Sequence, residues 1–205
     1  MPDELTLTNG VAFLSNEAEL AAIAAGVHDA GNPYFDFLFG GPDVARATLD
    51  QWIRRPTSEV YAGRAQILVE AGKPVGGFIA MSGADCVRGR LADAMALISD
   101  TRLPQQAMSD RLARTKGLFV TPASTDWYVS KVWVHPDFRG RGYGHRLAVE
   151  AFLRAGQGAG RTVADVHVNN VAALHTYAKH GITEIDRRSS PAGLTYVTVA
   201  VRRPG

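Results

Sequence analysis

This sequence has one cysteine, no long apolar run and almost no excess of charge. Cys86 is the single thiol, so an intramolecular disulfide is excluded. No apolar segment approaches the roughly 18 residues that a membrane-spanning helix needs. The 22 basic residues nearly balance the 20 acidic ones, giving a net charge of +2, so composition predicts neither a nucleic-acid nor a membrane partner. The start, Met1 to Leu5, lacks the charged and apolar regions of a signal peptide. We therefore expect a cytoplasmic protein.

Length and histidine spacing narrow the class further. A chain of 205 residues predicts a single domain over 1–205, because domains typically span about 100 to 200 residues. The six histidines and the one cysteine show no spacing typical of a zinc site. We therefore expect no metal.

The stretch 127–144 carries the most specific pattern. Residues 127–134 are rich in β-branched and aromatic side chains, which favours a strand, and Pro136 ends its ladder. Glycines follow at 140, 142 and 144, and then apolar residues at helical spacing up to Phe152. A second strand is expected at 162–168, parallel to the first. Glycines at the end of such a strand let the backbone approach a ligand and expose N–H groups to an anion.

Two other glycine loops can be tested against this spacing. A P-loop needs Gly-Lys followed by Ser or Thr, which is absent. The dinucleotide-binding fingerprint needs a third glycine where His145 stands. Asp165 lies about 20 residues on, where such proteins bind ribose, but the wrong glycine spacing argues against that role.

The spacing fits Arg-x-x-Gly-x-Gly at 139–144, followed by Asn170, Tyr177 and Gly181. Together these residues resemble the GNAT acetyltransferase family. The resemblance covers 127–201 well and the N-terminal half only in outline. It implies an α/β fold with a mixed, mostly antiparallel central sheet, flanking helices and a parallel strand pair around the acyl-CoA site. The acyl-CoA-binding core is expected at 127–181.

The resemblance also implies acetyl-CoA as co-substrate and a set of residues that bind it. Val132 and Val134 match the strand whose backbone pairs with pantetheine. Asn170 matches an asparagine near the cofactor, although it can equally cap the helix at 171–180. The pyrophosphate is expected on the backbone N–H groups of Arg139, Gly140, Arg141, Gly142, Tyr143 and Gly144. The two arginine side chains can instead face solvent.

The acid–base residues are less defined. Tyr177 matches the tyrosine that is proposed in the family to protonate the leaving thiolate, and a phenol with a pKa near 10 suits an acid; the alternative is a core tyrosine. Many members have a carboxylate where this chain has Tyr128, with Asp126 nearby. The catalytic candidates are therefore Tyr177, Tyr128 and Asp126. Two alternatives for the general base stay open: Asp36 acting through water, or no dedicated base at all.

The N-terminal half supplies the frame. We expect a short strand at 11–14, a helix after Asn16, a second helix after Pro42, and a hairpin of strands at 65–70 and 75–81. Gly76 and Gly77 in the second strand indicate a bulge or a close backbone approach. The aromatic residues Tyr34, Phe35 and Phe37 either pack in the core or line the acceptor site.

A helical insertion between strands is expected at 83–125, as a lid over the site or as a contact in a homodimer. The overall prediction is an N-acetyltransferase in which a primary amine of a small molecule or peptide attacks acetyl-CoA directly. The alternative is a catalytically weak CoA-binding regulatory module, which the absent carboxylate favours. A nucleic-acid contact through Arg-Gly-Arg-Gly is disfavoured, because no basic stripe with interleaved aromatics surrounds it.

Overall fold

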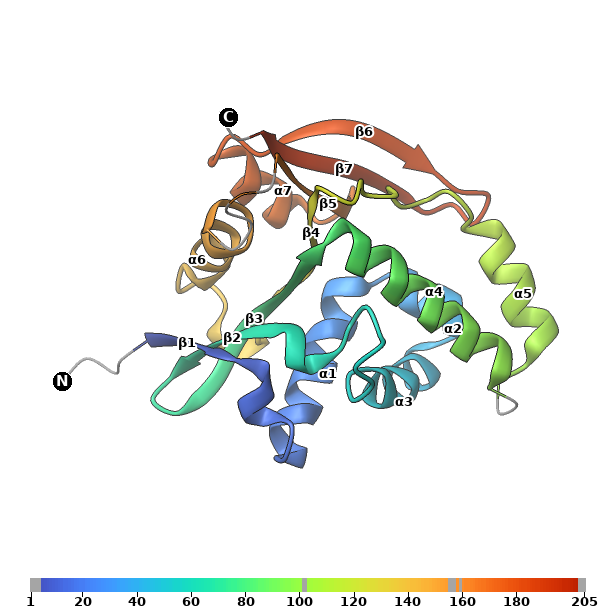
Figure 1. Ribbon diagram of the computed structural model, residues 1–205, viewed down its shortest axis with the longest axis horizontal. Coiled ribbons are helices and arrows are strands. Elements are labelled where there is room, and N and C mark those ends of the chain that lie inside the picture. Colours follow the sequence, from blue (N-terminus) through green and yellow to red (C-terminus); the bar gives the residue numbers. More distant parts are fainter. Residues whose placement is uncertain (1–4, 101–102, 155–157, 159, 203–205) are drawn as a thin grey trace.

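The fold is built on one mixed sheet, seen edge-on in Figure 1. A computed structural model describes residues 5–100, 103–154, 158 and 160–202. Seven strands follow the order β1-β2-β3-β4-β5-β7-β6. All described neighbours pair antiparallel except β4 and β5, which are parallel. The strands are β1 (Leu5–Asn9), β2 (Ala65–Glu70), β3 (Lys73–Ser82), β4 (Trp127–Val134), β5 (Arg161–His167), β6 (Thr183–Ser189) and β7 (Thr195–Arg202).

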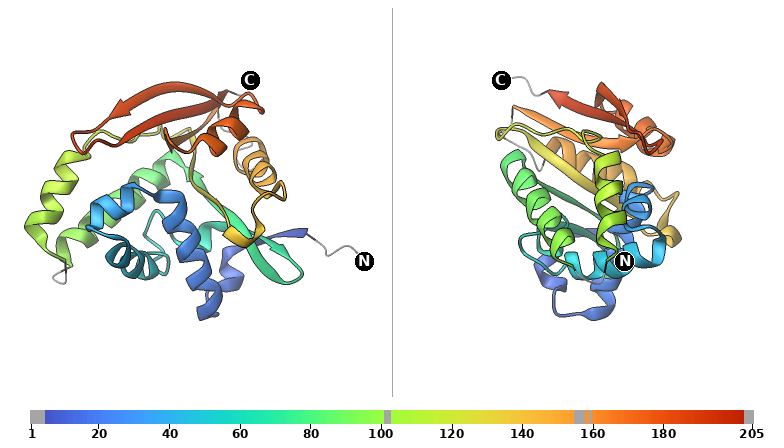
Figure 2. Two further views of the ribbon diagram at one scale, coloured as in Figure 1. Left: turned by 180° about the vertical axis from the view of Figure 1, so that it is seen from behind. Right: turned by 90° about the vertical axis from the view of Figure 1, so that its right-hand side faces the viewer.

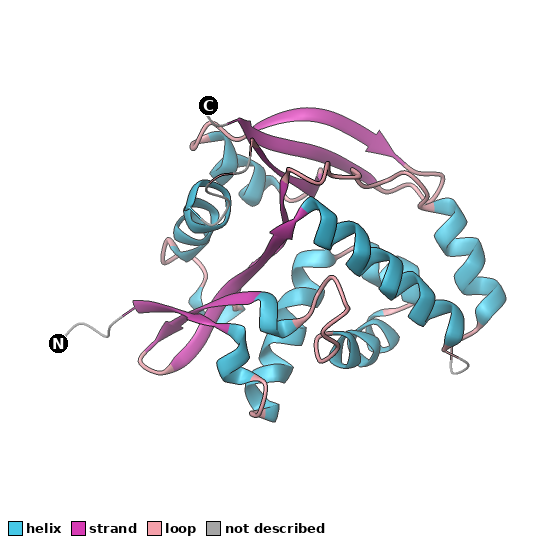
Figure 3. Cartoon of the chain, viewed as in Figure 1, coloured by secondary structure: helices cyan, strands magenta, loops and turns pink. Residues whose placement is uncertain are grey.

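Helices cover both faces of this sheet. On one side lie α1 (Glu17–Gly31), α2 (Tyr34–Phe39), α3 (Pro42–Trp52), α4 (Gly83–Ser99) and α5 (Gln105–Arg114). On the other lie α6 (Tyr143–Ala148), its π-helical continuation η4 (Val149–Arg154), and α7 (Val171–Ala178), as Figures 1 and 2 show. The short 3-10 helices are η1 (Gly10–Phe13), η2 (Ala62–Arg64) and η3 (Pro136–Phe138). Figure 3 shows the strands running between the two helical layers. The expected mixed, mostly antiparallel α/β architecture is confirmed.

The first predicted strand is wrong. Residues 11–14 contribute to η1, and the strand, β1, comes before it. The side chain of Asn9 accepts a hydrogen bond from the N–H of Val11 at 2.9 Å, which starts a helical turn. The predicted helix after Asn16 is confirmed as α1, and the Asn16 side chain accepts from the N–H groups of Ala18 and Glu19.

The aromatic segment after α1 is itself a short helix, α2, and not only a connection between helices. It ends where Gly40 adopts a φ of 82°, in the left-handed region that favours glycine. The N–H groups of Gly40 and Gly41 both donate to the carbonyl of Asp36, at 3.0 and 2.9 Å. The sharp turn lets α3 begin at Pro42 and pack against both α1 and α2.

The hairpin of β2 and β3 is confirmed, and so is the close backbone approach expected at its glycines. A Cβ on Gly76 would lie 2.6 Å from the carbonyl oxygen of Trp133 in β4. A Cβ on Gly77 would lie 2.8 Å from the carbonyl oxygen of Gln66 in β2. The β2–β3 register also shifts between Leu68 and Val69, next to these glycines. No larger residue fits either position without moving a neighbouring strand.

The segment between β3 and β4 carries α4 and α5. Ser82 caps α4, because its hydroxyl accepts from the N–H of Asp85 at 3.1 Å. One face of α4 packs on β3 and β4 and buries, for example, Asp93 and Leu97. The opposite face leaves Val87, Leu91, Met95 and Ile98 exposed. Within the described part of the chain, no helix is both long and apolar enough to cross a membrane.

A bulge in β4 changes which face its side chains occupy. Tyr128 and Trp133 belong to the core under α1 to α4, whereas Val129, Val132 and Val134 belong to the core under α6 and η4. Strict alternation would place 128 and 133 on opposite faces. The β3–β4 register shifts here, since Ile79 pairs with residue 131 and the next residue of β3 pairs with 129. The unpaired extra residue is Ser130.

β4 and β5 separate soon after they begin. Only Trp127 with Thr162 and Tyr128 with Val163 are paired between them. Beyond these pairs the two strands diverge, and the sheet continues on the far side of β5 through β7. The edge of β4 from the bulge onward therefore faces an opening rather than a neighbouring strand.

Candidate active site

The opening between β4 and β5 forms a cleft of about 770 Å³. Its walls are the diverging strands, the glycine loop and the start of α7. Val132, Val134, Arg139, Gly140, Gly142, Tyr143, Gly144, Asn170 and Tyr177 all line it. Ligand clefts typically measure about 300–1,000 Å³, so this cleft can hold an extended cofactor.

The glycine loop presents open backbone to the cleft. Gly140 and Gly142 have φ of 79° and 81°, which other residues adopt only with strain. A Cβ built on either glycine meets nothing within 4 Å, so the space above the loop is free. The carbonyl of Gly142 accepts from the N–H of Arg146 at 3.2 Å and starts α6. The geometry fits an anionic group held by main-chain N–H groups.

The two arginine side chains of the loop are already paired. Arg139 lines the cleft, and its guanidinium contacts the carboxylate of Asp29. Arg141 does not line the cleft; it lies 3.3 Å from a carboxylate oxygen of Glu70. The hydroxyl of Tyr143 also donates to Glu70. These contacts hold the loop against β2 and α1.

The backbone of β4 has the orientation that pantetheine pairing requires. The N–H of His135 donates to the carbonyl of Val75 in the β3 hairpin at 2.9 Å. Backbone N–H and C=O groups alternate in direction along a strand. Those of Val132 and Val134 therefore point to the opposite edge of β4, toward the cleft. The carbonyl of Val134 accepts from Nε of Arg139 at 3.2 Å. The remaining edge groups are open to an extended amide-bearing ligand.

Two further residues of the predicted cofactor set meet at α7. Asn170 lines the cleft and also caps the helix, because its Oδ1 accepts from the N–H of Ala173 at 3.2 Å. Tyr177 is only 6% exposed and packs on Phe152 at 4.9 Å between ring centroids. Burial raises the pKa of Tyr177 well above its usual value. The phenol therefore stays protonated at neutral pH.

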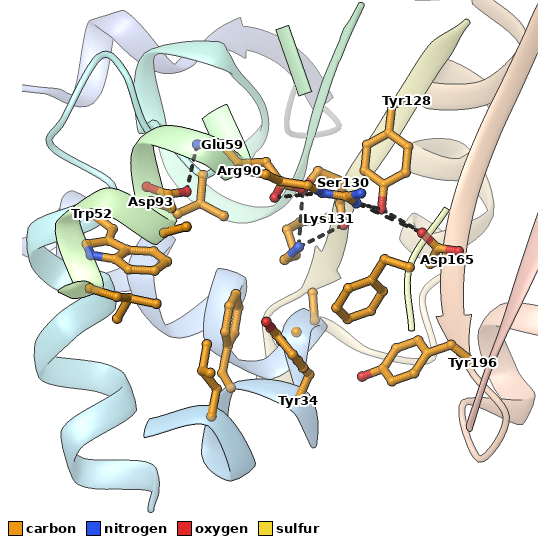
Figure 4. Close-up of a pocket in the computed structure, with 18 of the residues that line it drawn as sticks. Tyr34, Trp52, Glu59, Arg90, Asp93, Tyr128, Ser130, Lys131, Asp165 and Tyr196 are labelled. Atoms are coloured by element: carbon orange, nitrogen blue, oxygen red, sulfur yellow. Dashed lines mark hydrogen bonds and ion pairs between the residues drawn. The ribbon is translucent and has the colours of Figure 1, made fainter. Parts of the chain in front are cut away.

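A second, smaller cavity of about 210 Å³ lies between the sheet and the helices α1, α2 and α4. Figure 4 shows Trp52 on one side of it and Asp165 with Tyr196 on the other. The apolar lining, besides Trp52, includes Leu38, Val60, Ala94, Leu97 and Leu112. Charged and hydroxyl groups line the rest. Of the aromatic residues expected at an acceptor site, Tyr34 and Phe35 line this cavity. Phe37 does not, and packs near Leu118 and under Arg114.

Glu59 is a buried carboxylate at the polar side of this cavity. Its Oε1 accepts from the hydroxyl of Ser130 at 2.6 Å, and its Oε2 accepts from Nε of Arg90 at 3.3 Å. Burial alone would raise the pKa of Glu59, but the positive charges of Arg90 and Lys131 outweigh it and hold that pKa below its usual value. Glu59 is therefore ionised.

Arg90 joins Glu59 to a second carboxylate. Its guanidinium donates to the hydroxyl of Tyr128 at 2.6 Å and to the carbonyl of Val120 at 2.6 Å. The Tyr128 hydroxyl in turn donates to Asp165 at 3.1 Å. Asp165 also accepts from the hydroxyl of Thr198 at 2.7 Å. Burial raises the pKa of Tyr128, so its phenol is fixed as a donor within this network rather than as a base.

Asp93 on α4 lies at the Trp52 side of the cavity (Figure 4). It accepts from Arg55 at 2.7 Å, from the hydroxyl of Ser58 at 3.1 Å and from the N–H of Glu59 at 3.0 Å. Burial outweighs these contacts and raises the pKa of Asp93 to about 6. Every carboxylate of the cavity is thus held by donors from the protein.

The cleft and the cavity meet at the β4 bulge. Ala30, Ser130, Lys131, Asp165 and Tyr196 line both of them. The bulge places Ser130 and Lys131, which are consecutive, on the same side of the strand. Nζ of Lys131 donates to the hydroxyl of Ser130 at 3.1 Å, and burial lowers the pKa of this lysine.

Tyr196 faces the same meeting point from β7. It is 6% exposed, and its hydroxyl makes no hydrogen bond of acceptable geometry. Burial raises the pKa of Tyr196, and the nearby backbone of Tyr34 lowers this pKa to a smaller extent. Figure 4 shows the hydroxyl directed into the cavity. A buried hydroxyl without a partner costs about 1–3 kcal/mol, so a ligand oxygen or nitrogen here would recover stability.

The remaining predicted catalytic residue lies elsewhere. Asp126 lines neither the cleft nor the cavity. Its carboxylate pairs with Arg161 at 2.7 Å and accepts from the N–H of Ala123 at 2.9 Å, which fixes the turn before β4. Asp36 pairs with His28 at 2.7 Å and also lies outside both lining sets.

Sequence reasoning did not identify most of the polar cavity. Glu59 lies in an irregular segment after α3, and Arg90 and Asp93 lie within the insertion. Of the charged residues of this cavity, only Asp165 had been considered, as a ribose partner, because of its distance from the glycines. A charged residue within an apolar strand was the available signal for Lys131. Among the described residues, no three His, Cys, Asp or Glu side chains are grouped as metal ligands.

Comparison with known proteins agrees with this geometry. The profile of the Acetyltransferase (GNAT) family matches residues 27–182. The chain belongs to the GNAT acetyltransferase family. The match begins in α1 and ends after α7, so it includes both halves of the site. The search of curated proteins returned no match.

Solved structures share this GNAT fold at low sequence identity. An N-acetyltransferase from Staphylococcus aureus Mu50 is 17% identical with a TM-score of 0.67, over 91% of this chain and 97% of that one. The aminoglycoside acetyltransferase AAC(6')-Ib with coenzyme A is 16% identical with a TM-score of 0.51, over 97% and 94%. A chain of the NatC complex bound to Gag peptide and CoA is 15% identical with a TM-score of 0.54, over the full length of both. At these identities the likeness concerns the fold.

Proposed function

We propose that this GNAT protein transfers an acetyl group from acetyl-CoA to a primary amine by direct attack. The observation that carries the proposal is that the cleft and the cavity share Ser130, Lys131 and Tyr196. A cofactor along β4 and an amine in the cavity would then meet at the bulge. Holding two reactants side by side removes the need for a covalent enzyme intermediate.

The proton released by the amine has a route through Ser130. A serine hydroxyl has one donor and two acceptor positions. Ser130 donates to Glu59 at 2.6 Å and accepts from Lys131 at 3.1 Å, which leaves one acceptor position for the amine N–H. As the nitrogen–carbon bond forms, the amine proton passes to Ser130 and the Ser130 proton passes to Glu59. Glu59 thereby acts as the base, a role for which this chain has no carboxylate at position 128, where it has Tyr128.

Lys131 and Tyr177 serve the other charges of the reaction. The oxygen of the thioester gains negative charge during attack, and a cationic Lys131 at the meeting point stabilises it. The carbon–sulfur bond then breaks, and the thiolate takes a proton from the Tyr177 phenol, which lines the cleft. Glu59 then releases its proton to solvent and Tyr177 takes one up from solvent, which restores the starting protonation states of both residues.

Calorimetry with acetyl-CoA and CoA, followed by thiol release over a panel of amines, tests the proposal. Saturable binding with amine-dependent CoA release is the expected result. Binding without release from any amine would instead favour a regulatory CoA-binding module. Absence of binding to either compound would overturn the assignment of the cleft.

A further inference from the structure

The cavity beside the bulge differs chemically along its length, and this difference defines a ligand. The side that holds Trp52 also carries Asp93, whose carboxylate is bound by protein donors. The apolar lining comes from several helices and includes Leu38 and Leu97. The near side of the cavity, at the junction with the cleft, holds Ser130 and Lys131. A ligand with its amine at the junction must therefore place the rest of its body against the apolar lining.

The size of the cavity limits that body. Clefts for drug-sized ligands measure about 300–1,000 Å³, and this cavity measures about 210 Å³. Aromatic rings of Tyr34, Phe35, Trp52 and Phe119 are among its walls. Such walls favour a flat ring or a branched alkyl group through apolar burial and ring contacts.

The charges of the cavity argue against a polycationic ligand. Glu59 is held by Ser130 and Arg90. Asp165 is held by Tyr128 and Thr198, besides a backbone N–H. The third carboxylate, on Asp93, is likewise occupied by protein donors. All three carboxylates already accept hydrogen bonds from the protein, so additional ammonium groups would compete with these donors.

We propose that the acceptor is a compact primary amine with a single charge and an apolar aryl or branched-alkyl body, which fills the cavity while its nitrogen reaches Ser130. The inference rests on the proposed acetyl transfer and names its acceptor class. Binding then derives mainly from the apolar body. Selectivity follows because a small polar amine leaves the apolar lining uncovered, and a polycation brings ammonium groups that compete with protein donors for the three carboxylates.

The test compares kcat/KM for five amines. We expect 2-phenylethylamine and 3-methylbutylamine to exceed ethanolamine, spermidine and a dialanine peptide at least ten-fold. Ala94→Phe places a ring in the apolar lining and should lower kcat/KM for 2-phenylethylamine at least ten-fold, with unchanged affinity for CoA, because Ala94 does not line the cleft. Met95→Phe, on the exposed face of the same helix, is the matched control and should change neither.

Calorimetric titration of 2-phenylethylamine into CoA-saturated protein separates this inference from the proposed function. Binding that Ala94→Phe abolishes, without acetyl transfer to any amine, would support this class of ligand for the cavity and refute the transferase. Transfer that is fastest to spermidine or to the peptide would refute the acceptor class and keep the transferase. If the apolar amines are neither bound nor acetylated, the inference is overturned.

If Ala94→Phe does not fold, Leu97→Ala serves in its place. Removing the buried Leu97 side chain enlarges the cavity at its apolar lining. The ratio of kcat/KM for tryptamine to that for 3-methylbutylamine should then rise at least five-fold. Calorimetry then measures the affinities of Leu97→Ala and wild type for tryptamine and 3-methylbutylamine, and the ratio of the two affinities is compared between the proteins. An unchanged ratio in both measurements would contradict the proposed placement.

Discussion

The hydroxyl of Ser130 donates to Oε1 of Glu59 at 2.6 Å, across 71 positions of sequence. Ser130 is the bulged residue of β4, and Glu59 lies in the irregular segment between α3 and β2. Lys131 donates to the same hydroxyl at 3.1 Å. One hydroxyl thus connects a buried carboxylate to the point where the two cavities meet.

Ser130→Ala should lower kcat about 10²-fold or more, because general-base catalysis typically contributes 10²–10⁴-fold. Glu59→Gln should act similarly, while Ser130→Thr keeps the hydroxyl and most of the rate. Steady-state kinetics on an accepted amine provides the measurement, and Ser109→Ala on the exposed side of α5 is the control. Equal kcat for Ser130→Ala and Ser130→Thr would exclude the relay.

Gly142→Trp should weaken acetyl-CoA binding strongly, because the indole would project into the free space above the loop. Gly72→Trp is a matched control: Gly72 has a similar φ of 77° and equally open surroundings, but lies in the β2–β3 turn. Both variants carry the strain of a left-handed residue, about 1–2 kcal/mol. Calorimetry should show lost affinity for the first variant alone. Unchanged affinity in both would remove the cofactor from this loop.

Tyr177→Phe should lower kcat about 10²-fold and leave acetyl-CoA affinity nearly unchanged, because the ring still packs on Phe152 while the proton donor is lost. Since burial raises the pKa of Tyr177, the wild-type rate should not fall between pH 7 and 9 through loss of this proton. Tyr61→Phe, at a tyrosine that lines neither the cleft nor the cavity, is the control. Full turnover by Tyr177→Phe across that pH range would end the acid assignment.

Asp93 should impose a pH dependence on stability. Burial raises its pKa to about 6 in the folded protein, against about 3.9 when unfolded. Between these values the folded state retains a proton that the unfolded state has released, so this carboxyl's contribution to stability falls as pH rises from about 4 to about 6. At 1.36 kcal/mol per pKa unit the fall is at most about 3 kcal/mol.

Asp93→Asn should remove that part of the pH dependence. The difference in free energy of unfolding between wild type and variant, from urea denaturation at pH 4 and pH 7, provides the measurement. Asp43→Asn serves as the control, because the Asp43 side chain is 98% exposed. A difference that does not change with pH would show that Asp93 titrates normally.

Local pattern was sufficient for much of the fold. Turn residues between two strand-like segments predicted the β2–β3 hairpin, and β-branched and aromatic residues predicted β4. The strand at 11–14 was wrong because a side-chain cap from Asn9 favours a helical turn there. That contact depends on a single hydrogen bond, which hydrophobic period does not record.

The candidate site divides along the same line. Its cofactor half lies on one continuous stretch of the chain from β4 to α7. Gly140, Gly142, Asn170 and Tyr177 therefore have a fixed spacing in the sequence, and that spacing carried the resemblance. Its acceptor half does not lie on one such stretch. Glu59 and Arg90 come from separate segments, and they meet Asp165 only because α4 packs against β3 and β4.

By itself, the sequence determined the glycine loop, the strand before it and the family resemblance, because these depend on backbone conformations that glycine, proline and β-branched residues impose locally. Only the tertiary structure decided which charges face the cavity beside β4. The bulge at Ser130 arises from a register shift against β3, and it directs Ser130 and Lys131 to one side of the strand. Register is a property of two paired strands, so no window of the chain around residue 130 contains it.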